Sequence, residues 1–153
     1  MNNGFFLGNR ILDISLISAF TAQFWKVIRP IFRRSKPRWD RMWETGGMPS
    51  SHSAAVTSLA TCVGILDGFK SVEFAICVIF SIIIMYDAAG IRRAAGKHAG
   101  ILNSLMEIMK EREHIKIKQT QLKELLGHEP IEVIAGAILG IVVALLMIGY
   151  LRG

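Results

Sequence analysis

A chain of 153 residues leaves room for one domain, which we expect to cover residues 1–153, and a content of 52% hydrophobic against 20% charged residues is far more apolar than that of an ordinary soluble domain. The net charge of +6 does not indicate nucleic-acid binding, because on so apolar a chain basic residues mostly flank membrane segments. Cys62 and Cys77 lie within apolar runs, where cysteine usually behaves as a small hydrophobic residue and not as a disulfide partner or metal ligand.

Four apolar segments predict an all-α fold, an integral membrane helical bundle with about four transmembrane helices. A helix needs about 20 apolar residues, at a rise of about 1.5 Å each, to cross the hydrocarbon core. The candidates are residues 11–28, 53–69, 72–91 and 132–151. The first carries Asp13, Gln23 and Lys26, so it either spans the bilayer or lies in its interface as an amphipathic helix. The second is rich in small residues, which allow membrane helices to pack closely.

Two polar connections, 29–51 and 92–131, carry most of the positive charge. Because only a tight turn fits between the second and third segments, these form a hairpin, and both long connections fall on one side of the membrane. They hold 14 of the 18 Lys and Arg residues, namely Arg29, Arg33, Arg34, Lys36, Arg38, Arg41, Arg92, Arg93, Lys97, Lys110, Arg112, Lys116, Lys118 and Lys123. The positive-inside rule predicts that both connections are cytoplasmic and both termini outside. Apolar residues at partly helical spacing between 102 and 126 predict a cytoplasmic amphipathic helix, on the membrane surface or against the bundle.

A glycine-containing loop leads directly into the second segment and ends in Ser50, Ser51 and His52. Backbone N–H groups at a helix N-terminus, with Ser hydroxyls beside them, can form an anion-binding site. The serines could equally act only as N-caps. His52 opens its helix at the membrane edge, where an ionisable side chain is either functional or an ordinary interfacial residue.

His128 opens the last segment on the same side of the membrane, and Glu132 follows four positions later on the same helical face. A carboxylate that accepts the N–H of a histidine fixes its tautomer and leaves the other ring nitrogen available as a nucleophile or base. A His and a Glu at this spacing are also a common structural pair on helices. The residues alone leave both interpretations open.

Together these motifs resemble a known family. The loop segment 49–52, Pro-Ser-Ser-His, the pair His128-x-x-x-Glu132 and the pair Gly136-x-x-x-Gly140 are similar to the type 2 phosphatidic acid phosphatase superfamily, whose signatures are a Pro-Ser-Gly-His loop and a His-x-x-x-Asp followed by small residues. Three stretches resemble more closely the superfamily's short divergent branch, related to acid phosphatases and vanadium-dependent haloperoxidases: residues 46–54, 85–97 and 122–140. The resemblance covers the chain from about residue 26 onward.

The resemblance implies an all-helical bundle that hydrolyses a phosphate monoester through a phosphohistidine, with no metal and no cofactor. It makes His128 the nucleophile, Glu132 the group that orients it and His52 the acid that protonates the leaving alcohol. Ser50 and Ser51 would hold phosphate oxygens. The chain departs from the family pattern in having Ser51 in place of Gly and Glu132 in place of Asp.

The phosphate-binding cations depart further from the family pattern. Lys26 and Arg33 have the spacing of the superfamily's Lys-x6-Arg element, but Leu122 stands where the superfamily has an arginine, six residues before the nucleophile. Fixed cations are needed because the transition state of phosphoryl transfer spreads negative charge over its oxygens. We expect Arg92 and Arg93, at the end of the third segment, to supply them, although paired arginines at a membrane edge also act as topology determinants alone.

The leading hypothesis is a membrane phosphatase in a bacterial plasma membrane, acting on a lipid phosphate monoester from the cytoplasmic leaflet. The alternatives are a non-catalytic lipid-phosphate binder or flippase-like protein, which would explain Leu122, and a small structural subunit. The expected partners are the lipid phosphate and membrane lipids. We also expect a homodimer, because four spans enclose a lipid site poorly and Gly136 with Gly140 offers a packing face.

Overall fold

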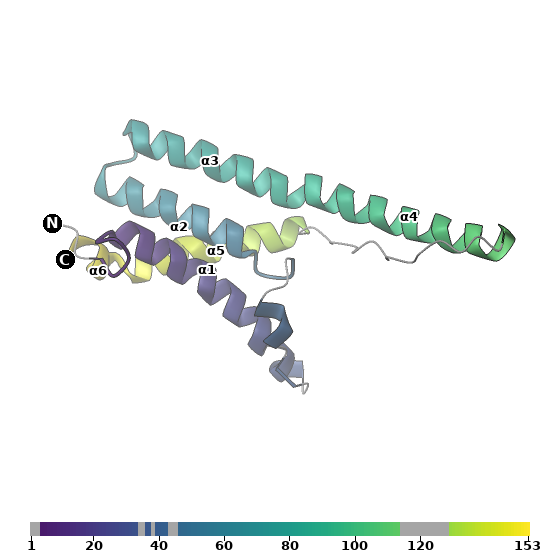
Figure 1. Ribbon diagram of the computed structural model, residues 1–153. Helices are drawn as coiled ribbons and strands as arrows, with labels where there is room; N and C mark the ends of the chain where they lie inside the picture. The colour runs from purple at the N-terminus through teal and green to yellow at the C-terminus, as the bar shows by residue number, and fades with distance from the viewer. Residues whose placement is uncertain (1–3, 34–35, 38, 43–45, 114–128) are drawn as a thin grey trace.

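The computed structural model describes residues 4–33, 36–37, 39–42, 46–113 and 129–153, without the side chains of residues 33, 40, 41, 91–97 and 110–113. Every element in this part of the chain is a helix, which confirms the all-α class. In chain order the elements are α1 (Arg10–Ile28), η1 (Arg29–Arg33), η2 (Trp39–Met42), α2 (Ser51–Leu66), α3 (Val72–Ala89), α4 (Ile91–Glu113), α5 (Pro130–Leu146) and α6 (Ile148–Arg152). Both termini lie at one end of the bundle, and η1, η2 and α4 lie toward the other (Figure 1).

Capping side chains explain where the long helices begin. The side-chain oxygen of Asn9 accepts hydrogen bonds from the N–H groups of Ile11 at 3.0 Å and Leu12 at 3.2 Å, and so starts α1. The hydroxyl of Ser71 accepts from the N–H of Phe74 at 3.1 Å and starts α3. The predicted boundaries at 11 and 72 therefore agree with the observed ones.

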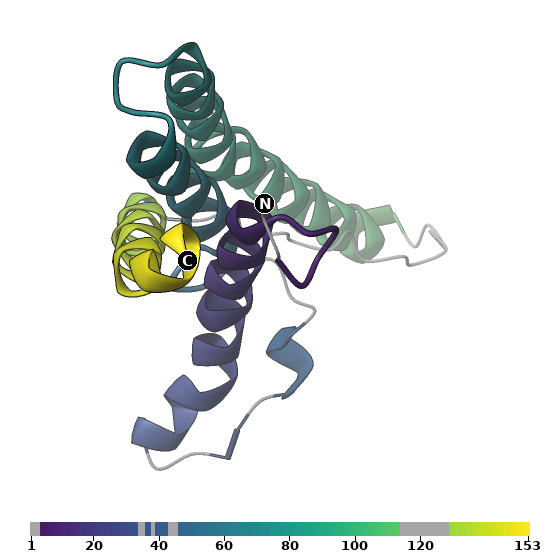
Figure 2. The same ribbon diagram turned by 90° about the vertical axis from the view of Figure 1, so that its left-hand side faces the viewer.

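The central helix of the bundle is α2, which contacts α1, α3 and α5 (Figure 2). Small side chains make this central position possible, because they let neighbouring helices approach from several sides. The buried residues of α2 are Ser53, Ala54, Val56, Thr57, Ser58, Ala60, Cys62, Val63 and Gly64. The Ser- and Ala-rich segment that the sequence marks as a closely packed helix is thus the core of the fold.

Two glycines of α5 form its closest contact with α2. A Cβ atom added to Gly136 would overlap the carbonyl oxygen of Ser50, and one added to Gly140 would overlap the carbonyl oxygen of Ala54. At the same level, Thr57 Oγ1 donates a hydrogen bond of 3.1 Å to the carbonyl of Ala137, so the two helices are also joined by a polar contact. The predicted packing face is used inside the bundle. It gives no support to the expected homodimer, because α2 of the same chain already covers it.

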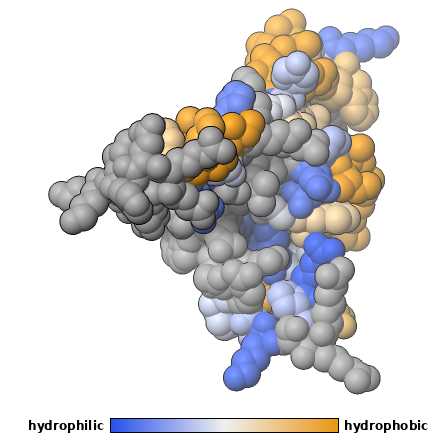
Figure 3. All heavy atoms as spheres, turned by 90° about the vertical axis from the view of Figure 1, so that its right-hand side faces the viewer, coloured by the Kyte–Doolittle hydropathy of each residue, from blue (hydrophilic) through white to orange (hydrophobic). Residues whose placement is uncertain are grey.

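Polar residues are buried inside this bundle, and large apolar residues face outward. The buried polar residues are Asp13, Ser15, Ser18, Lys26, Ser50, Ser53, Thr57, Ser58 and Ser81. On α3 only Ser81 and Ala88 are buried, whereas Ile76, Ile79 and Ile83 are exposed. Seen from the α4 end, hydrophobic residues form patches along the outer rim of the molecule (Figure 3). This distribution is the reverse of that in a soluble domain and fits a lipid environment.

Two of the described helices are long and apolar enough to cross a membrane, namely Arg10–Phe32 and Val72–Ala89. Only 11% of the apolar stretch of α3 is buried, so α3 is not the core helix of a soluble protein. The other two predicted spans are shorter. α2 has 16 residues and α5 has 17, which at about 1.5 Å each is less than the roughly 30 Å of a hydrocarbon core. The predicted segment 132–151 is also interrupted at Met147, which separates α5 from α6.

A buried carboxylate ties the two chain ends together. Asp13 is 2% exposed, and its two oxygens accept hydrogen bonds from Phe5 N–H at 2.7 Å, Phe6 N–H at 2.8 Å and the hydroxyl of Tyr150 at 2.5 Å. Arg10 lies over the Tyr150 ring, 5.5 Å from its centroid. Three donors compensate for the burial of this charge, so the polar residue in the first span serves to close the terminal end of the bundle.

The amphipathic helix of the second long connection is α4, which follows α3 after Gly90 and projects beyond the bundle (Figure 1). Among the described residues it contacts α3 and no other element, so of the two predicted positions, on the membrane surface or against the bundle, this part of the chain favours the first. Its apolar residues are exposed: Ile101, Leu102, Leu105, Ile108 and Met109. The part of the predicted pattern from residue 114 onward lies outside the described residues.

Candidate functional site

Two glycines and a cis proline shape the loop before α2. Gly46 and Gly47 have φ angles of 99° and 81°, in the left-handed region where other residues are strained. The Met48–Pro49 peptide bond is cis. At Gly47 the loop runs beside Lys26 of α1, because a Cβ atom there would lie 3.7 Å from Lys26 Cδ. The backbone angle of Gly47 therefore favours glycine, and its contact with the neighbouring helix is an ordinary one.

Ser50 joins the start of α2 to the start of α5. Its backbone N–H donates to the carbonyl of Glu132 at 2.9 Å. Gly136, one turn further along α5, has no side chain and so allows the backbones of the two helices to touch. The Ser50 side chain is fully buried, and its hydroxyl accepts from the N–H of Ser53 at 3.3 Å. Ser50 is thus the N-cap of α2, one of the two roles that the sequence left open. Its binding of phosphate stays a prediction.

Gln23 connects three parts of the site and was not among the predicted site residues. Its Oε1 accepts hydrogen bonds from Lys26 Nζ and from Ser51 Oγ, both at 3.1 Å, while its Nε2 donates to the carbonyl of Met42 at 2.8 Å. One amide therefore links α1, η2 and the first turn of α2. The available sequence signal was a glutamine three residues before a lysine, one helical turn apart, in an otherwise apolar segment.

The first turn of α2 gathers groups that favour an anion. Ser51 is half-buried and His52 is exposed. The first N–H groups of a helix have no carbonyl one turn earlier to accept their hydrogen bonds, and they carry the positive end of the helix dipole. Lys26, 3% exposed, brings a buried ammonium to the same place through Gln23. A helix N-terminus with an adjoining cation is suited to a phosphate.

Glu132 lies in the first turn of α5, close to the site through its backbone. One carboxylate oxygen accepts from the N–H of Glu129 at 3.2 Å, as in a capping box. This contact holds the beginning of α5 in shape. The predicted partner of Glu132, His128, lies outside the described residues, as does Leu122, so the role of Glu132 in orienting a histidine stays a prediction.

The remaining predicted cations are described by their backbone alone. Arg33 is the last residue of η1, and Arg92 and Arg93 belong to the first turn of α4. All three come after helices, α1 and α3, that end away from the termini, and the last turn of α1 with Lys26 and the first turn of α2 lie toward the same end (Figure 1). The structure therefore joins Lys26 to Ser51 through Gln23 and joins Ser50 to the backbone of Glu132 by a direct hydrogen bond, with His52 on the same turn as Ser51. The arginines belong to elements at the same end.

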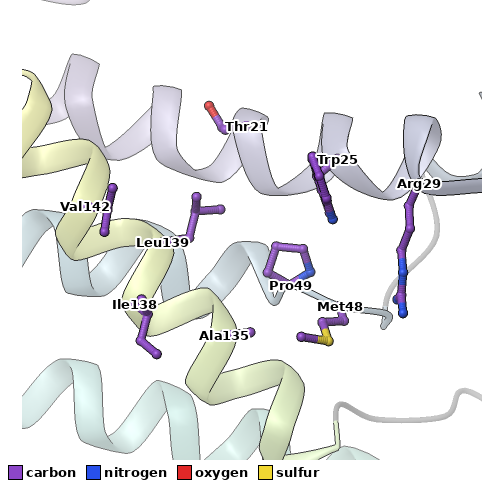
Figure 4. A pocket seen from close by; sticks show the side chains of 9 residues that line it. All are labelled: Thr21, Trp25, Arg29, Met48, Pro49, Ala135, Ile138, Leu139 and Val142. Atoms are coloured by element: carbon purple, nitrogen blue, oxygen red, sulfur yellow. The ribbon is translucent and has the colours of Figure 1, made fainter. Parts of the chain in front are cut away.

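A cavity of about 550 Å³ lies between α1 and α5, next to the loop before α2. Nine side chains line it, among them Trp25 and Arg29 of the α1–η1 region and Met48 and Pro49 of the loop (Figure 4). Most of its wall is apolar. Among the described residues, no group of three or more His, Cys, Asp or Glu side chains is arranged so that it could hold a metal ion.

The helical bundle has an apolar exterior and buried polar residues, and at one end of it hydrogen bonds connect several of these polar residues. These features are those of a membrane protein. The sequence matches a family model described as the divergent PAP2 family over residues 7–143, and the chain belongs to this family. It is also 43% identical over 150 residues to the uncharacterized membrane protein YuiD of Bacillus subtilis (strain 168), covering 92% of this chain and 95% of that protein. No solved structure matches the chain. These comparisons confirm the family resemblance read from the sequence motifs.

Proposed function

We propose that the chain is a membrane phosphatase that hydrolyses a lipid phosphate monoester through a phosphohistidine, without a metal or other cofactor. The observation that supports this most is the junction at Ser50, where the Pro-Ser-Ser-His loop meets the helix that follows His128. The two segments that carry the family's signatures lie far apart in the sequence, yet a hydrogen bond of 2.9 Å from Ser50 N–H to the Glu132 carbonyl joins them. Membership of the divergent PAP2 family supports the same activity.

The proposal includes four membrane-crossing helices, with the site facing the cytoplasm of a bacterial cell. α1 and α3 have the length to span. α2 is covered by α1, α3 and α5, so its length need not match the hydrocarbon core, and α6 follows α5 directly after the interruption at Met147. The long connections with 14 of the 18 basic residues leave the bundle at the site's end, which the positive-inside rule assigns to the cytoplasm.

In the first step of the reaction, His128 attacks the phosphorus in line with the ester oxygen. A bond forms between the imidazole nitrogen and phosphorus, the bond from phosphorus to the alcohol oxygen breaks, and protonated His52 donates its proton to that oxygen as the alcohol leaves. Glu132 holds the other imidazole nitrogen. The N-terminus of α2 with Ser51 and Lys26, together with Arg33, Arg92 and Arg93, stabilises the charge on the equatorial oxygens.

In the second step, water attacks the phosphorus of the phosphohistidine. His52, now neutral, takes the water proton, the bond from phosphorus to nitrogen breaks, and inorganic phosphate is released. The sum of the two steps is one ester and one water converted into one alcohol and one phosphate. Both histidines return to their starting protonation states, so the cycle requires no further reactant.

The alternative function is a lipid-phosphate-binding protein that does not turn over. It is favoured by Leu122 in the place of the superfamily's arginine and by the hydrogen bond that the Ser51 hydroxyl donates to Gln23. Such a protein would bind the phosphate at the same anion site, at the first turn of α2. The two functions differ in whether phosphate is released.

The test is phosphate release by the purified protein in lipid, with EDTA present, across phosphatidic acid, phosphatidylglycerophosphate and isoprenyl phosphates. We expect release that persists in EDTA, that falls to background in His128→Ala and that falls by about 100-fold or more in His52→Ala. His98→Ala is the matched control, because His98 is an exposed histidine on α4. Binding without release by folded wild-type protein supports the alternative, and release unchanged in His128→Ala contradicts the mechanism.

A further inference from the structure

The cavity between α1 and α5 has apolar walls and one cationic end. Trp25 of α1 and Ile138 of α5 both line it, and Thr21 adds a methyl surface, because its hydroxyl donates to the carbonyl of Ile17 at 2.7 Å. Arg29 is the charged member of the nine side chains that line the cavity. Figure 4 shows the Arg29 side chain extending from the end of α1 toward Met48. One end of the cavity is therefore positively charged, and the rest of its length is apolar.

The cationic end of the cavity adjoins the candidate site. Met48 and Pro49 line this end, and Ser50, the N-cap of α2, follows directly in the chain. Thr21 lies toward the other end, about 12 Å from Arg29 along α1 at the usual helical rise. A ligand with its phosphate at the first turn of α2 would therefore have a path of this length for an attached hydrocarbon chain.

The cavity is open toward the outer surface of the bundle, which is apolar. Ile138 is 57% exposed and Trp25 is 45% exposed, although both line the cavity. Trp25 is held in place by stacking on Phe32, with ring centroids 5.8 Å apart. A hydrocarbon chain can enter such an opening from the bilayer without leaving an apolar environment, whereas a water-soluble ester gains little from it.

We infer that this cavity binds one acyl chain of a phosphatidic-acid-type lipid, with Arg29 against the lipid phosphate. The inference rests on the proposed function for the lipid phosphate monoester and for the position of its phosphate, and it adds where the chain binds and which side chain meets the phosphate. Charge complementarity favours an anionic headgroup over the zwitterionic headgroup of phosphatidylcholine. The apolar wall supplies binding energy through the chain, as remote parts of a substrate often do.

Trp25 offers a direct probe of this cavity. The chain has three tryptophans, and the double variant Trp39→Phe/Trp43→Phe leaves Trp25 as the fluorophore. The protein is placed in phosphatidylcholine bilayers that contain a low mole fraction of a lipid with brominated chains, which quench tryptophan on contact. We expect saturable quenching by brominated phosphatidic acid that unbrominated phosphatidic acid reverses. Neither inorganic phosphate nor glycerol 3-phosphate should reverse it, since both lack the chain.

Two variants of α5 one residue apart test the position of the chain. Ala135 lines the cavity, whereas Ile134 is an exposed residue of the same helix that does not line it. We expect Ala135→Phe to weaken the saturable quenching by about tenfold or more, because the added ring fills the cavity, and Ile134→Phe to leave it unchanged. Circular dichroism of both variants confirms folding. Val142→Phe, at the far end of the cavity, should weaken the binding of lipids with palmitoyl chains more than the binding of lipids with octanoyl chains.

Several results would overturn the inference. Quenching that is equal for brominated phosphatidylcholine and phosphatidic acid, and linear in mole fraction, would show an ordinary lipid-facing surface. Equal effects of Ala135→Phe and Ile134→Phe, with no change of chain-length preference in Val142→Phe, would place the chain elsewhere. Quenching needs no turnover, so the two proposals can fail separately. Saturable binding without phosphate release would contradict the proposed phosphatase activity and support binding of the chain in the cavity. Turnover of long-chain lipids that Ala135→Phe leaves unaltered would support the phosphatase activity and contradict binding of the chain in the cavity.

Discussion

The adjacent helices α2 and α3 differ in almost every physical respect. α2 is central, built of small residues and buried on the sides that face α1, α3 and α5, whereas α3 contacts the bundle along a narrow stripe that includes Ser81 and Ala88. Its large aliphatic residues face outward. The candidate site belongs to the first turn of α2. In this fold, the helix of small residues positions the candidate site, and the helix of large residues presents an apolar face to its surroundings.

The largest expected effect comes from separating α2 and α5. Gly140→Leu puts a side chain where the carbonyl of Ala54 and the hydroxyl of Thr57 already lie, so the helices must move apart. We expect a loss of about 3 kcal/mol in the free energy of unfolding, near the upper end for overpacking. Thermal unfolding in detergent measures it. Gly149→Leu is the control, since no atom lies within 4 Å of a Cβ there, and equal losses in both variants would contradict the close contact.

A smaller effect is expected at the junction of α1 with the first turn of α2. Gln23→Leu removes the acceptor shared by Lys26 and Ser51 and the donor to the Met42 carbonyl. We expect lipid-phosphate turnover to fall by about tenfold or more, equivalent to about 1.4 kcal/mol, because the cation and the hydroxyl lose their common support.

Gln23→Glu separates positioning from charge. It keeps the acceptor for Lys26 and Ser51, loses the donor to the Met42 carbonyl and adds a negative charge beside the anion site. We expect the unfolding midpoint to fall only by the contribution of the lost hydrogen bond to Met42, less than in Gln23→Leu, while KM for the lipid phosphate rises. Thr61→Val is the control, because the Thr61 hydroxyl donates within α2, to the carbonyl of Thr57, away from the site. An unchanged KM in Gln23→Glu would argue against an anion at this place.

The buried stripe of α3 is expected to contribute less. Ser81 Oγ donates to the carbonyl of Val56 in α2 at 2.9 Å and to that of Cys77 at 2.7 Å. Ser81→Ala removes this link between the helices, with an expected loss of about 1 kcal/mol, typical of one hydrogen bond. The unfolding midpoint gives the measurement. A loss as large as that of Gly140→Leu would mean that α3 is as important to the core as α2.

The outward face of α3 should be the least sensitive. Ile79 is 58% exposed, and lipid replaces most of what the side chain would contact in a soluble core. We expect Ile79→Ala to change the free energy of unfolding by less than about 0.5 kcal/mol, as for exposed substitutions in general. A loss of several times this value in the same unfolding assay would reveal a partner on that face and revise the comparison between the two helices.

Local sequence signals predicted the elements, but their packing partners depend on the whole chain. The beginnings of α1 and α3 follow from apolar runs preceded by Asn9 and Ser71, both strong capping residues. The interruption at Met147 has no proline or glycine at that position to announce it. The pair Gly136 and Gly140 predicted a close contact correctly. It did not identify the partner, because a flat face of small residues fits a helix of the same chain as well as a second copy.

For the candidate site, the sequence identified the residue types and missed the connection between them. Ser50, Ser51 and Lys26 were predicted to belong together through family resemblance, and they do lie together. Gln23, which links Lys26 to Ser51, requires η2 and α2 to come beside α1, and no spacing within one segment encodes this. The position of Arg29 could not be predicted for the same reason. Arg29 lies near the site because it lines a cavity together with residues of the loop before α2 and of α5.

The central claim is tested most directly by trapping the covalent intermediate. Wild-type protein turning over phosphatidic acid is quenched rapidly into alkali, digested and analysed by mass spectrometry for phosphorylated peptides. The account predicts a phosphoryl group on His128 that is stable in alkali, labile in acid, absent in His128→Ala and present in His98→Ala. Phosphate release with no modification of His128, or release that survives His128→Ala, would contradict it.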